Sequence, residues 1–515
     1  MNDQKKLLTL LVALFVSSAA FAQKPGDWPQ WGRDETRNMV SKTAKGIPES
    51  FVAGQFIGAT DEIDIKTTKN VKWIAKLGSQ SYGNPTVANG RVFVGTNNDC
   101  PRDPRFKGDR SCVYCFDEGT GKLIWELNIP KLGTGKVSDW EFLGVCSSPA
   151  VDGDRVYIAT NKCEIMCLDV HGMKNGNDGP YKTEGLYMNW PKKTPMEVKD
   201  TDADIIWVTN MIDECGVFPH NITCCSVLVV GDKLFTSTSN GVDYGHVQTP
   251  APNAPSLIML DKKTGKVIGE ESSGMSSRIF HSNWTSPAYL KTKDKDLCIY
   301  GGPDGWVYAF KPETKKDADG FDILQEAWRF DANPPHYRKK NGKPIKYATR
   351  YGPSEVLGTP VVYDGHVYAV IGQDPEHGEG IGNMVCLDAN GKVVWQYDKI
   401  HRSLSTLSIY NGMVFAADYS GYVHCVDAKT GKANWVHNTN GHVWGSTLVA
   451  DGRVFVGSED GFLSVIPATK EYQKSKVKEI DMTSPIFSSP IAANGVLYVA
   501  TGTHLFAIAP TESGK

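Results

Sequence analysis

A repeat of about 58 residues runs through most of this 515-residue chain and constrains its fold more than any other feature. One copy contains the segments Pro85–Gly95, Val113–Asp117 and Thr120–Trp125. They predict an apolar strand, an Asn-Gly hairpin turn, an alternating strand, a third strand ending in Asp, and an outer strand containing Trp. The positions equivalent to Pro85 are Pro149, Val227, Pro287, Pro360, Leu407, Thr447 and Pro490.

Eight copies predict an all-β fold, an eight-bladed β-propeller of four-stranded antiparallel blades. The last copy, Pro490 to Ala509, stops after three strands, and the segment Asn70–Leu77 with its Trp73 resembles the missing fourth strand. We therefore expect an N-terminal strand to pair with the C-terminal blade. This pairing would close the ring and remove the exposed sheet edges.

The N-terminus has the pattern of an export signal, in which Lys5 and Lys6 precede an apolar run that ends at Phe21. Cleavage is expected after Ala22, giving a periplasmic or secreted protein without a membrane span, which we expect to be a monomer. The predicted organisation is a signal peptide at 1–22, an N-terminal extension at 23–69, and the propeller at 70–510 with insertions at about 172–204 and 333–351.

Charge and composition exclude several classes of protein. The chain has 55 basic and 58 acidic residues and a net charge of -3, so it has no electrostatic footprint for nucleic acid. Its 40% hydrophobic content excludes a disordered chain, and its 51 glycines fit a fold rich in turns.

The cysteines form a periodic group and a remainder. The periodic group lies two residues before the Asp that ends the third strand of a repeat. Other copies have Met or Ala at this position. A position shared by Cys, Met and Ala predicts a small buried apolar site in each blade, which we call the slot. These positions are Cys115, Cys167, Met259, Ala309, Cys386, Cys425 and Ala507. Among the remaining cysteines, Cys100 and Cys112 are the first pair expected to form a disulfide. No Cys-x-x-Cys-His motif occurs, so no haem is expected. Cys112 and Cys115 are not accompanied by a second cysteine pair at the spacing of a zinc site, so no zinc is expected.

One position in each repeat is expected to face the central channel, because it begins the innermost strand three residues before Pro85 or its equivalent. Its occupants are mostly large and vary from copy to copy, as expected of a ligand site on a repeated scaffold. The alternative is that these side chains simply plug the channel. The eight residues are Tyr82, Cys146, Cys224, Trp284, Leu357, Leu404, Trp444 and Phe487.

The Asp-x-x-Thr-Gly-Lys-x-x-Trp motif, complete at Asp117–Trp125 and Asp427–Trp435, resembles the tryptophan-docking motif of the quinoprotein (PQQ-repeat) propellers. The resemblance extends over residues 70–510. The opening Asp27–Trp31 is similar to the start of an uncharacterised branch of exported PQQ-like proteins. The family includes both PQQ-dependent dehydrogenases and non-catalytic propellers, so the resemblance implies the fold and leaves the function open.

In the dehydrogenases of this family, a disulfide between adjacent cysteines covers one face of the quinone and a Trp covers the other. By this resemblance, Cys224 and Cys225 would form the disulfide and Trp284 would stack on PQQ; longer-range bonds to Cys146 or Cys215 are the alternative. Two further cofactor-binding residues are predicted from their positions, one in the channel set and one in a basic loop. They are Trp444 and Arg350.

The same resemblance implies calcium beside the quinone. Asn240 matches the family's Asn ligand by position, and Glu164 and Asp243 are the other candidate metal ligands. No carboxylate lies near Trp284 where the family has its catalytic Asp. His281 and His246 are therefore the candidate catalytic bases, with hydrogen bonding between loops as the alternative role.

Two loops of similar composition, Gly301–Trp306 and Gly372–His377, have turn sequences and are secondary candidates for function.

Three functions remain compatible with the sequence, and whether the protein is an enzyme stays open. The first is a PQQ- and calcium-dependent oxidoreductase of alcohols or sugars. The second is a non-catalytic scaffold that binds a cell-envelope protein, and the third is a carbohydrate-active enzyme. All three place a small-molecule ligand or a protein partner at the mouth of the channel.

Overall fold

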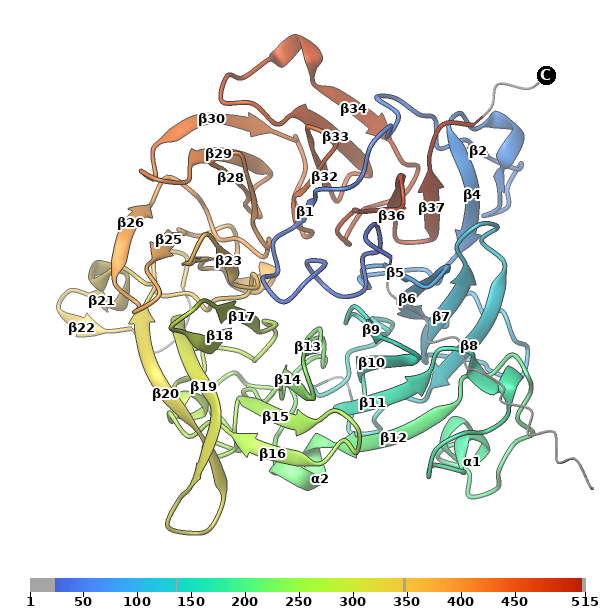
Figure 1. The fold of residues 1–515 in the computed structure, drawn as a ribbon, viewed down its shortest axis with the longest axis horizontal. Coiled ribbons are helices and arrows are strands. Elements are labelled where there is room, and N and C mark those ends of the chain that lie inside the picture. Colours follow the sequence, from blue (N-terminus) through green and yellow to red (C-terminus); the bar gives the residue numbers. More distant parts are fainter. Residues whose placement is uncertain (1–23, 136, 346–348, 512–515) are drawn as a thin grey trace, which may run out of the picture.

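The computed structural model describes residues 24–135, 137–345 and 349–511, and the signal peptide expected at 1–22 lies outside them. The described chain is an all-β fold in which four-stranded antiparallel sheets are arranged in chain order around a common centre (Figure 1). This is the arrangement of a β-propeller.

Five sheets of the described chain have four strands each. The first two comprise β5 (Thr86–Ala88), β6 (Arg91–Asn97), β7 (Ser111–Asp117) and β8 (Leu123–Ile129), then β9 (Ala150–Asp152), β10 (Arg155–Thr160), β11 (Glu164–Asp169) and β12 (Ile205–Asn210). The next two comprise β23 (Val361–Tyr363), β24 (His366–Val370), β25 (Met384–Leu387) and β26 (Val393–Tyr397), then β27 (Ser408–Tyr410), β28 (Met413–Ala417), β29 (Tyr422–Asp427) and β30 (Ala433–Asn438). The fifth comprises β35 (Ile491–Ala493), β36 (Val496–Ala500), β37 (His504–Ile508) and β4 (Val71–Lys76).

Two larger sheets are built from similar units. In one, a single parallel pairing between Glu270 and Ile323 joins two four-stranded units. The units are β13 (Leu228–Val230), β14 (Lys233–Ser237), β15 (Leu257–Asp261) and β16 (Val267–Glu270), and β17 (Ala288–Lys291), β18 (Asp296–Gly301), β19 (Trp306–Lys316) and β20 (Asp322–Asp331). The other sheet adds β1 (Val40–Ser41) to β31 (Leu448–Ala450), β32 (Arg453–Gly457), β33 (Phe462–Pro467) and β34 (Lys478–Asp481).

The strand immediately before the repeats and the last strand of the repeats share one sheet. Strand β4 pairs antiparallel with β37, with Trp73 opposite Ala507 and Lys76 opposite His504. Figure 1 shows blue β4 beside red β37.

The predicted Asn-Gly turns connect the first two strands of several sheets. At Asn89-Gly90, φ is 57° and 76°, and Asn411-Gly412 has 49° and 73°. Positive φ at both central residues matches the twist of a tight hairpin, and Gly adopts it without steric cost.

The periodic slot residues are all buried, as the sequence predicted. After each of them, the pairing register between the third and the fourth strand shifts. Most lie directly opposite the Trp of the fourth strand; Cys115, for example, pairs with Trp125, and Cys386 pairs with Trp395. A small or flexible residue is needed here because the indole occupies the space across the strand pair.

Each docking Trp also contacts the next repeat along the chain. Trp395 Nε1 donates to the Ala428 carbonyl at 2.9 Å, and a Cβ on Gly431 would lie 2.8 Å from the same indole. Trp73 does the same with the Glu118 carbonyl and Gly121. The Gly of the Thr-Gly-Lys turn is thus required both by its positive φ and by close packing.

Residues 26–40 form a segment that crosses the centre of the ring, drawn in blue in Figure 1, and we call it the N-terminal segment. It contacts the first hairpin of each four-stranded unit in turn, through at least one backbone or side-chain hydrogen bond to each. The contacts are Gly26–Asn494, Trp28–Val87, Pro29–Val151, Gln30–Val229, Glu35–Tyr289, Thr36–Val362, Asn38–Ile409 and Met39–Val449.

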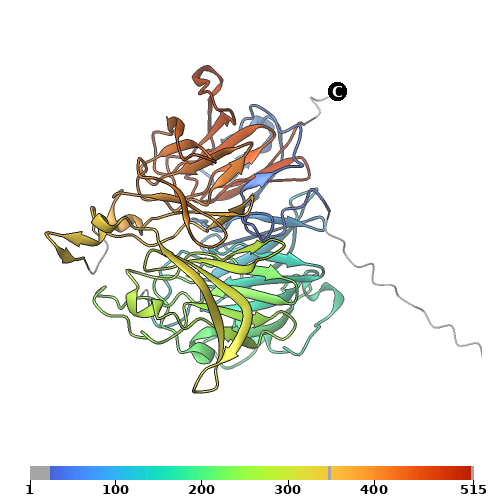
Figure 2. The same cartoon turned by 60° about the vertical axis from the view of Figure 1, so that its left-hand side comes forward.

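The remaining elements are short and lie outside the repeated sheets. The 172–204 insertion holds a 3₁₀ turn (Gly172–Asn175) and α1 (Glu184–Met188). The 333–351 insertion holds the hairpin β21 (Lys339–Lys340) and β22 (Lys343–Pro344), which projects from the ring in Figure 2. The other elements are the hairpin β2 (Gln55–Phe56) and β3 (Ile63–Asp64), α2 (Met211–Cys215) and 3₁₀ turns at Ile65–Thr67, Met275–Arg278, Pro335–Arg338, Pro375–His377 and Lys474–Lys476.

In the described part of the chain, no helix has the length and apolar character required to span a membrane.

Candidate functional site

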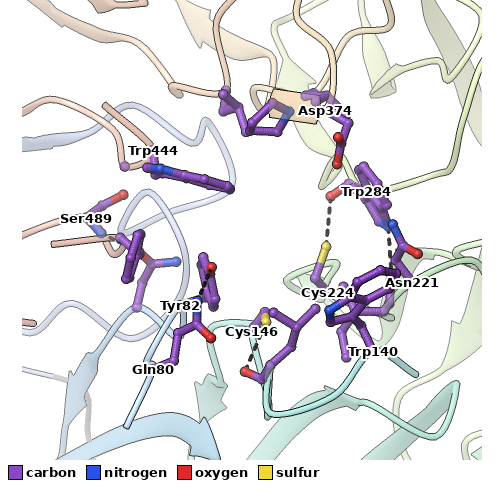
Figure 3. Close-up of a pocket in the computed structure, with 18 of the residues that line it drawn as sticks. Gln80, Tyr82, Trp140, Cys146, Asn221, Cys224, Trp284, Asp374, Trp444 and Ser489 are labelled. Carbon is purple, nitrogen blue, oxygen red and sulfur yellow. Dashed lines mark hydrogen bonds between the residues drawn. The ribbon is translucent and has the colours of Figure 1, made fainter. Parts of the chain in front are cut away.

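A cavity of about 430 Å³ lies at the centre of the ring, and we call it the central pocket (Figure 3). Its wall is built from the segments that precede the innermost strands, which begin later than the sequence predicted; β5, for example, begins at Thr86 and not at Tyr82. All eight positions predicted to face the channel line it, from Tyr82 in the first repeat to Phe487 in the last. The structure thus confirms that these residues meet at one place, and they leave a cavity of the size that small ligands occupy.

Six of the described lining residues are aromatic. Tyr82, Trp444 and Phe487 pack together on one side, with ring centroids 4.9 Å apart for Tyr82 and Phe487 and 5.7 Å apart for Tyr82 and Trp444. Trp284 and Trp140 lie on the opposite side in Figure 3. The pocket therefore presents aromatic surfaces from two directions.

The charged residues of the pocket are all acidic. Glu141, Asp374 and Glu376 line it, and no Lys or Arg is among the described lining residues. Burial disfavours the ionised form of Asp374, but interactions with His377 and His281 and a backbone hydrogen bond outweigh it and lower the pKa. The pocket thus carries negative charge next to aromatic faces.

The N-terminal segment contributes Trp31 to the pocket lining. Trp31 is buried and its Nε1 donates to Thr359 Oγ1 at 3.1 Å. The sequence predicts only an N-terminal extension here, with Asp27–Trp31 as a family signature, so the contribution of Trp31 to the pocket is a finding of the structure. The two closely spaced tryptophans of this segment, Trp28 and Trp31, were the available signal.

The adjacent cysteines do not form a disulfide, and all twelve cysteines are free thiols, including Cys100 and Cys112. Cys224 lines the pocket and its thiol is directed to the Trp284 carbonyl at 3.7 Å. Cys225 is fully buried and accepts a hydrogen bond from the Ser237 amide at 3.2 Å. Only Cys224 thus contributes to the pocket, because consecutive residues of an extended chain point to opposite sides. Burial raises the pKa of Cys224, which keeps the thiol neutral.

The two candidate bases lie together beside the pocket. The rings of His281 and His246 are 4.6 Å apart, and His281 is 4.9 Å from Trp284. His220, which sequence reasoning did not select, lies with its Nε2 2.8 Å from Nε2 of His281. His377, from the loop considered as a secondary candidate, has its ring 5.4 Å from that of His281.

The three candidate calcium ligands are each engaged elsewhere. The Asn240 side chain accepts from the Phe218 amide and donates to the Ala251 carbonyl, both at 2.9 Å. Asp243 caps its own turn through the amides of Val247 and Gln248.

Glu164 pairs with Lys162 at 3.0 Å and accepts from the Tyr187 hydroxyl at 2.7 Å. None of the three candidate ligands is among the described residues that line the central pocket. The calcium site implied by the family resemblance is therefore not assembled from them.

The central pocket also does not fit PQQ. Arg350 is exposed, lies over the ring of Tyr351 at 5.8 Å, and is not among the described lining residues. The carboxylates of PQQ would need cationic partners, and the pocket offers only the acidic set around Asp374. Trp284 and Trp444 could stack on a planar ligand, but the charge of the pocket opposes an anion.

Comparison with protein families matches residues 106–268 and 382–515 to the PQQ-repeat family described as outer membrane protein assembly factor BamB. A curated relative of the same description, from Moranella endobia (strain PCIT), is 26% identical over 138 residues. That alignment covers 26% of this chain and 33% of the relative.

Solved structures share the fold at low sequence identity. A europium-containing methanol dehydrogenase has a TM-score of 0.60 at 12% identity, covering 94% of this chain and 98% of that one. The quinohemoprotein alcohol dehydrogenase ADHIIG of Pseudomonas putida HK5 has a TM-score of 0.58 at 13% identity, covering 96% and 81%. BamB of Moraxella catarrhalis has a TM-score of 0.51 at 13% identity, covering 86% and 98%.

Proposed function

Since the chain belongs to the PQQ-repeat family described as outer membrane protein assembly factor BamB, we propose that it is a ligand-binding member whose central pocket takes an organic cation. One observation carries this proposal. Aromatic rings face the pocket from two sides, three acidic residues line it, and no basic side chain is among its described lining residues.

The physical basis is the attraction between a cation and the negative face of an aromatic ring. Quaternary ammonium groups are weakly hydrated, so they lose little on entering an aromatic pocket. Trp444 and Tyr82 offer ring faces, and the carboxylates of Glu141 and Glu376 favour positive charge.

We propose binding without turnover, because the three candidate calcium ligands Asn240, Asp243 and Glu164 are not among the described residues that line the pocket.

Binding is tested by titrating the protein with choline and with its neutral isostere 3,3-dimethyl-1-butanol, followed by tryptophan fluorescence and calorimetry. We expect choline to bind about tenfold more tightly than the isostere, because only choline gains the cation–π attraction. Trp444→Leu should raise the Kd for choline about tenfold.

Trp306→Leu is the matched control, since Trp306 is not a lining residue and should leave the Kd unchanged. Equal binding of choline and the isostere, or tight binding of PQQ, would contradict the proposal. Preferential binding of sugars would favour the carbohydrate alternative.

A second candidate function is a scaffold in outer-membrane protein assembly, and the family match and the Moranella relative support it. It predicts that cells lacking the protein accumulate less folded outer-membrane β-barrel protein, measured by heat-modifiable gel mobility. The ligand-binding proposal predicts no change in that measurement.

We further propose that the sheets form eight blades of one closed ring. The pairing of Trp73 with Ala507 supports closure, and the eight successive contacts of the N-terminal segment support the blade count.

Export is proposed from the Lys5–Ala22 pattern and the family's outer-membrane role. It predicts a mature protein that begins at Gln23 when its N-terminus is sequenced.

A further inference from the structure

Four histidines from separate loops meet behind the Trp284 wall of the central pocket, together with one carboxylate. We call this set the imidazole cluster; it consists of His220, His246, His281, His377 and Asp374. The ring centroids of His220 and His281 are 4.6 Å apart, and those of His220 and His246 are 5.0 Å apart.

The cluster contains two overlapping sets of ligand atoms. One nitrogen from each of His220, His246 and His281 lies within 4.8 Å of the others, and the same holds for His281, Asp374 and His377. His281 belongs to both sets. Such separations are suitable for convergence of side chains on one ion after small rotations of the rings.

Hydrogen bonding leaves ring nitrogens available for an ion. His220 Nδ1 lies 2.6 Å from the Val242 carbonyl, which accepts its proton. The lone pair of His220 Nε2 therefore faces Nε2 of His281 at 2.8 Å, and a bound ion would replace this contact. His281 is fully buried, and its Nδ1 has no hydrogen-bond partner among the described residues. A buried polar atom without a partner is costly, so it indicates a ligand that completes the site.

From this geometry we propose that the imidazole cluster binds one divalent transition-metal ion, with imidazole nitrogens as the main ligands and Asp374 as a carboxylate ligand. Imidazole selects borderline ions such as Zn²⁺, Co²⁺, Ni²⁺ or Cu²⁺ over Ca²⁺ and Mg²⁺, which prefer oxygen. Cysteine spacing, from which no zinc is expected, carries no information about these histidines. The histidines are far apart in the sequence and no motif unites them.

The protonation of the cluster agrees with this role. Burial lowers the pKa of His220 to about 4 and that of His281 to about 3. Both rings are therefore neutral near pH 7, as metal ligation requires.

Neighbouring groups hold the ligand loops in place. Glu355 Oε1 accepts from the backbone amides of His281 at 2.7 Å and Ser282 at 3.0 Å. Arg402, also buried, donates to the His377 carbonyl at 2.9 Å. This support from outside the cluster positions both His281 and His377.

The imidazole cluster adjoins the proposed cation pocket and shares Asp374 with it. Asp374 lines the central pocket and also belongs to the cluster, and the Trp284 ring contacts His281. The metal proposal does not depend on choline binding.

The test uses the mature chain without a polyhistidine tag, stripped with EDTA and titrated with Co²⁺. We expect one Co²⁺ per chain, with a visible d–d absorption band that Zn²⁺ displaces and Ca²⁺ does not. His281→Ala and His220→Ala should each weaken binding by at least about 100-fold.

His366→Ala is the matched control, because His366 lies in β24 outside the cluster and should leave Co²⁺ affinity unchanged. If the substitutions at the buried histidines prevent folding, His246→Ala replaces them as the test variant, because His246 is only half-buried. It should weaken Co²⁺ binding about tenfold or more. Absence of stoichiometric Co²⁺ binding, or equal binding by the wild type and all three cluster variants, would overturn the proposal. Either result leaves the choline test unaffected.

Discussion

A single buried carboxylate shows how the turns of the repeats are stabilised at the scale of one residue. Asp418 accepts hydrogen bonds from the His401 amide at 3.1 Å, from the Tyr422 amide at 3.1 Å and from His424 Nε2 at 3.0 Å. Burial alone would raise its pKa, but bonds from His401 and His424 outweigh burial and lower the pKa from 3.8 to about 2. The charged form is therefore stabilised in the folded protein.

The pKa of Asp418 is lower in the folded than in the unfolded protein. Its carboxylate therefore stabilises the folded protein above about pH 4, and this stabilisation is lost as the pH falls toward about 2. Asp418→Asn should therefore lower the free energy of unfolding by about 2 kcal/mol at pH 7, and the difference should shrink below about pH 4. Urea denaturation of both proteins across this pH range measures it.

Asp398→Asn, at an exposed ion pair with Lys399, is the control and should change stability by less than about 0.5 kcal/mol. A difference for Asp418→Asn that stays constant down to pH 2 would contradict this assignment.

At the scale of an element, the N-terminal segment forms part of the wall of the central pocket, because its Trp31 lines the pocket. It is held by Arg37, which is fully buried and donates to the carbonyls of Pro287 at 2.8 Å, Trp31 at 2.6 Å and Ser226 at 3.2 Å. Burial lowers the pKa of Arg37 to about 10, so it remains charged at pH 7. One side chain thus ties the segment to the two four-stranded units that begin with β13 and β17.

Arg37→Leu should lower the free energy of unfolding by about 3 kcal/mol, because three buried carbonyls lose a charged donor. Arg33→Leu is the matched control: Arg33 also has a positive φ, but its side chain donates only in an exposed bond, to the Pro25 carbonyl. Its substitution should cost about 0.5 kcal/mol or less. Chemical denaturation compares the two, and equal losses would show that Arg37 does not anchor the segment.

At the scale of the whole molecule, stability depends on whether the two ends of the chain form one continuous ring. Trp73 in β4 and Trp395 in β26 occupy equivalent docking positions, one at the junction of the two ends and one within the chain. Their exposed fractions are 5% and 7%. In a closed ring every docking contact has a neighbour on both sides, whereas the end of an open array would fray.

Trp73→Ala and Trp395→Ala should therefore lower the free energy of unfolding by similar amounts, about 3–5 kcal/mol each. Equilibrium denaturation measures both, and each serves as the control for the other. A loss below about 1 kcal/mol for Trp73→Ala beside a large loss for Trp395→Ala would show that the ring is open.

Local chemistry in the sequence determined the sheets, their hairpin turns, the slot opposite each outer Trp and the positions facing the axis. These follow from strand alternation, from the positive φ that Asn-Gly accepts, and from repeat spacing. The tertiary structure decided which loops meet: His220, His246 and His281 converge, whereas Asn240 and Glu164 find separate partners. The reason is that contacts between blades depend on how the ring curves and how the N-terminal segment crosses it, and residues distant in the chain carry no local signal of that geometry.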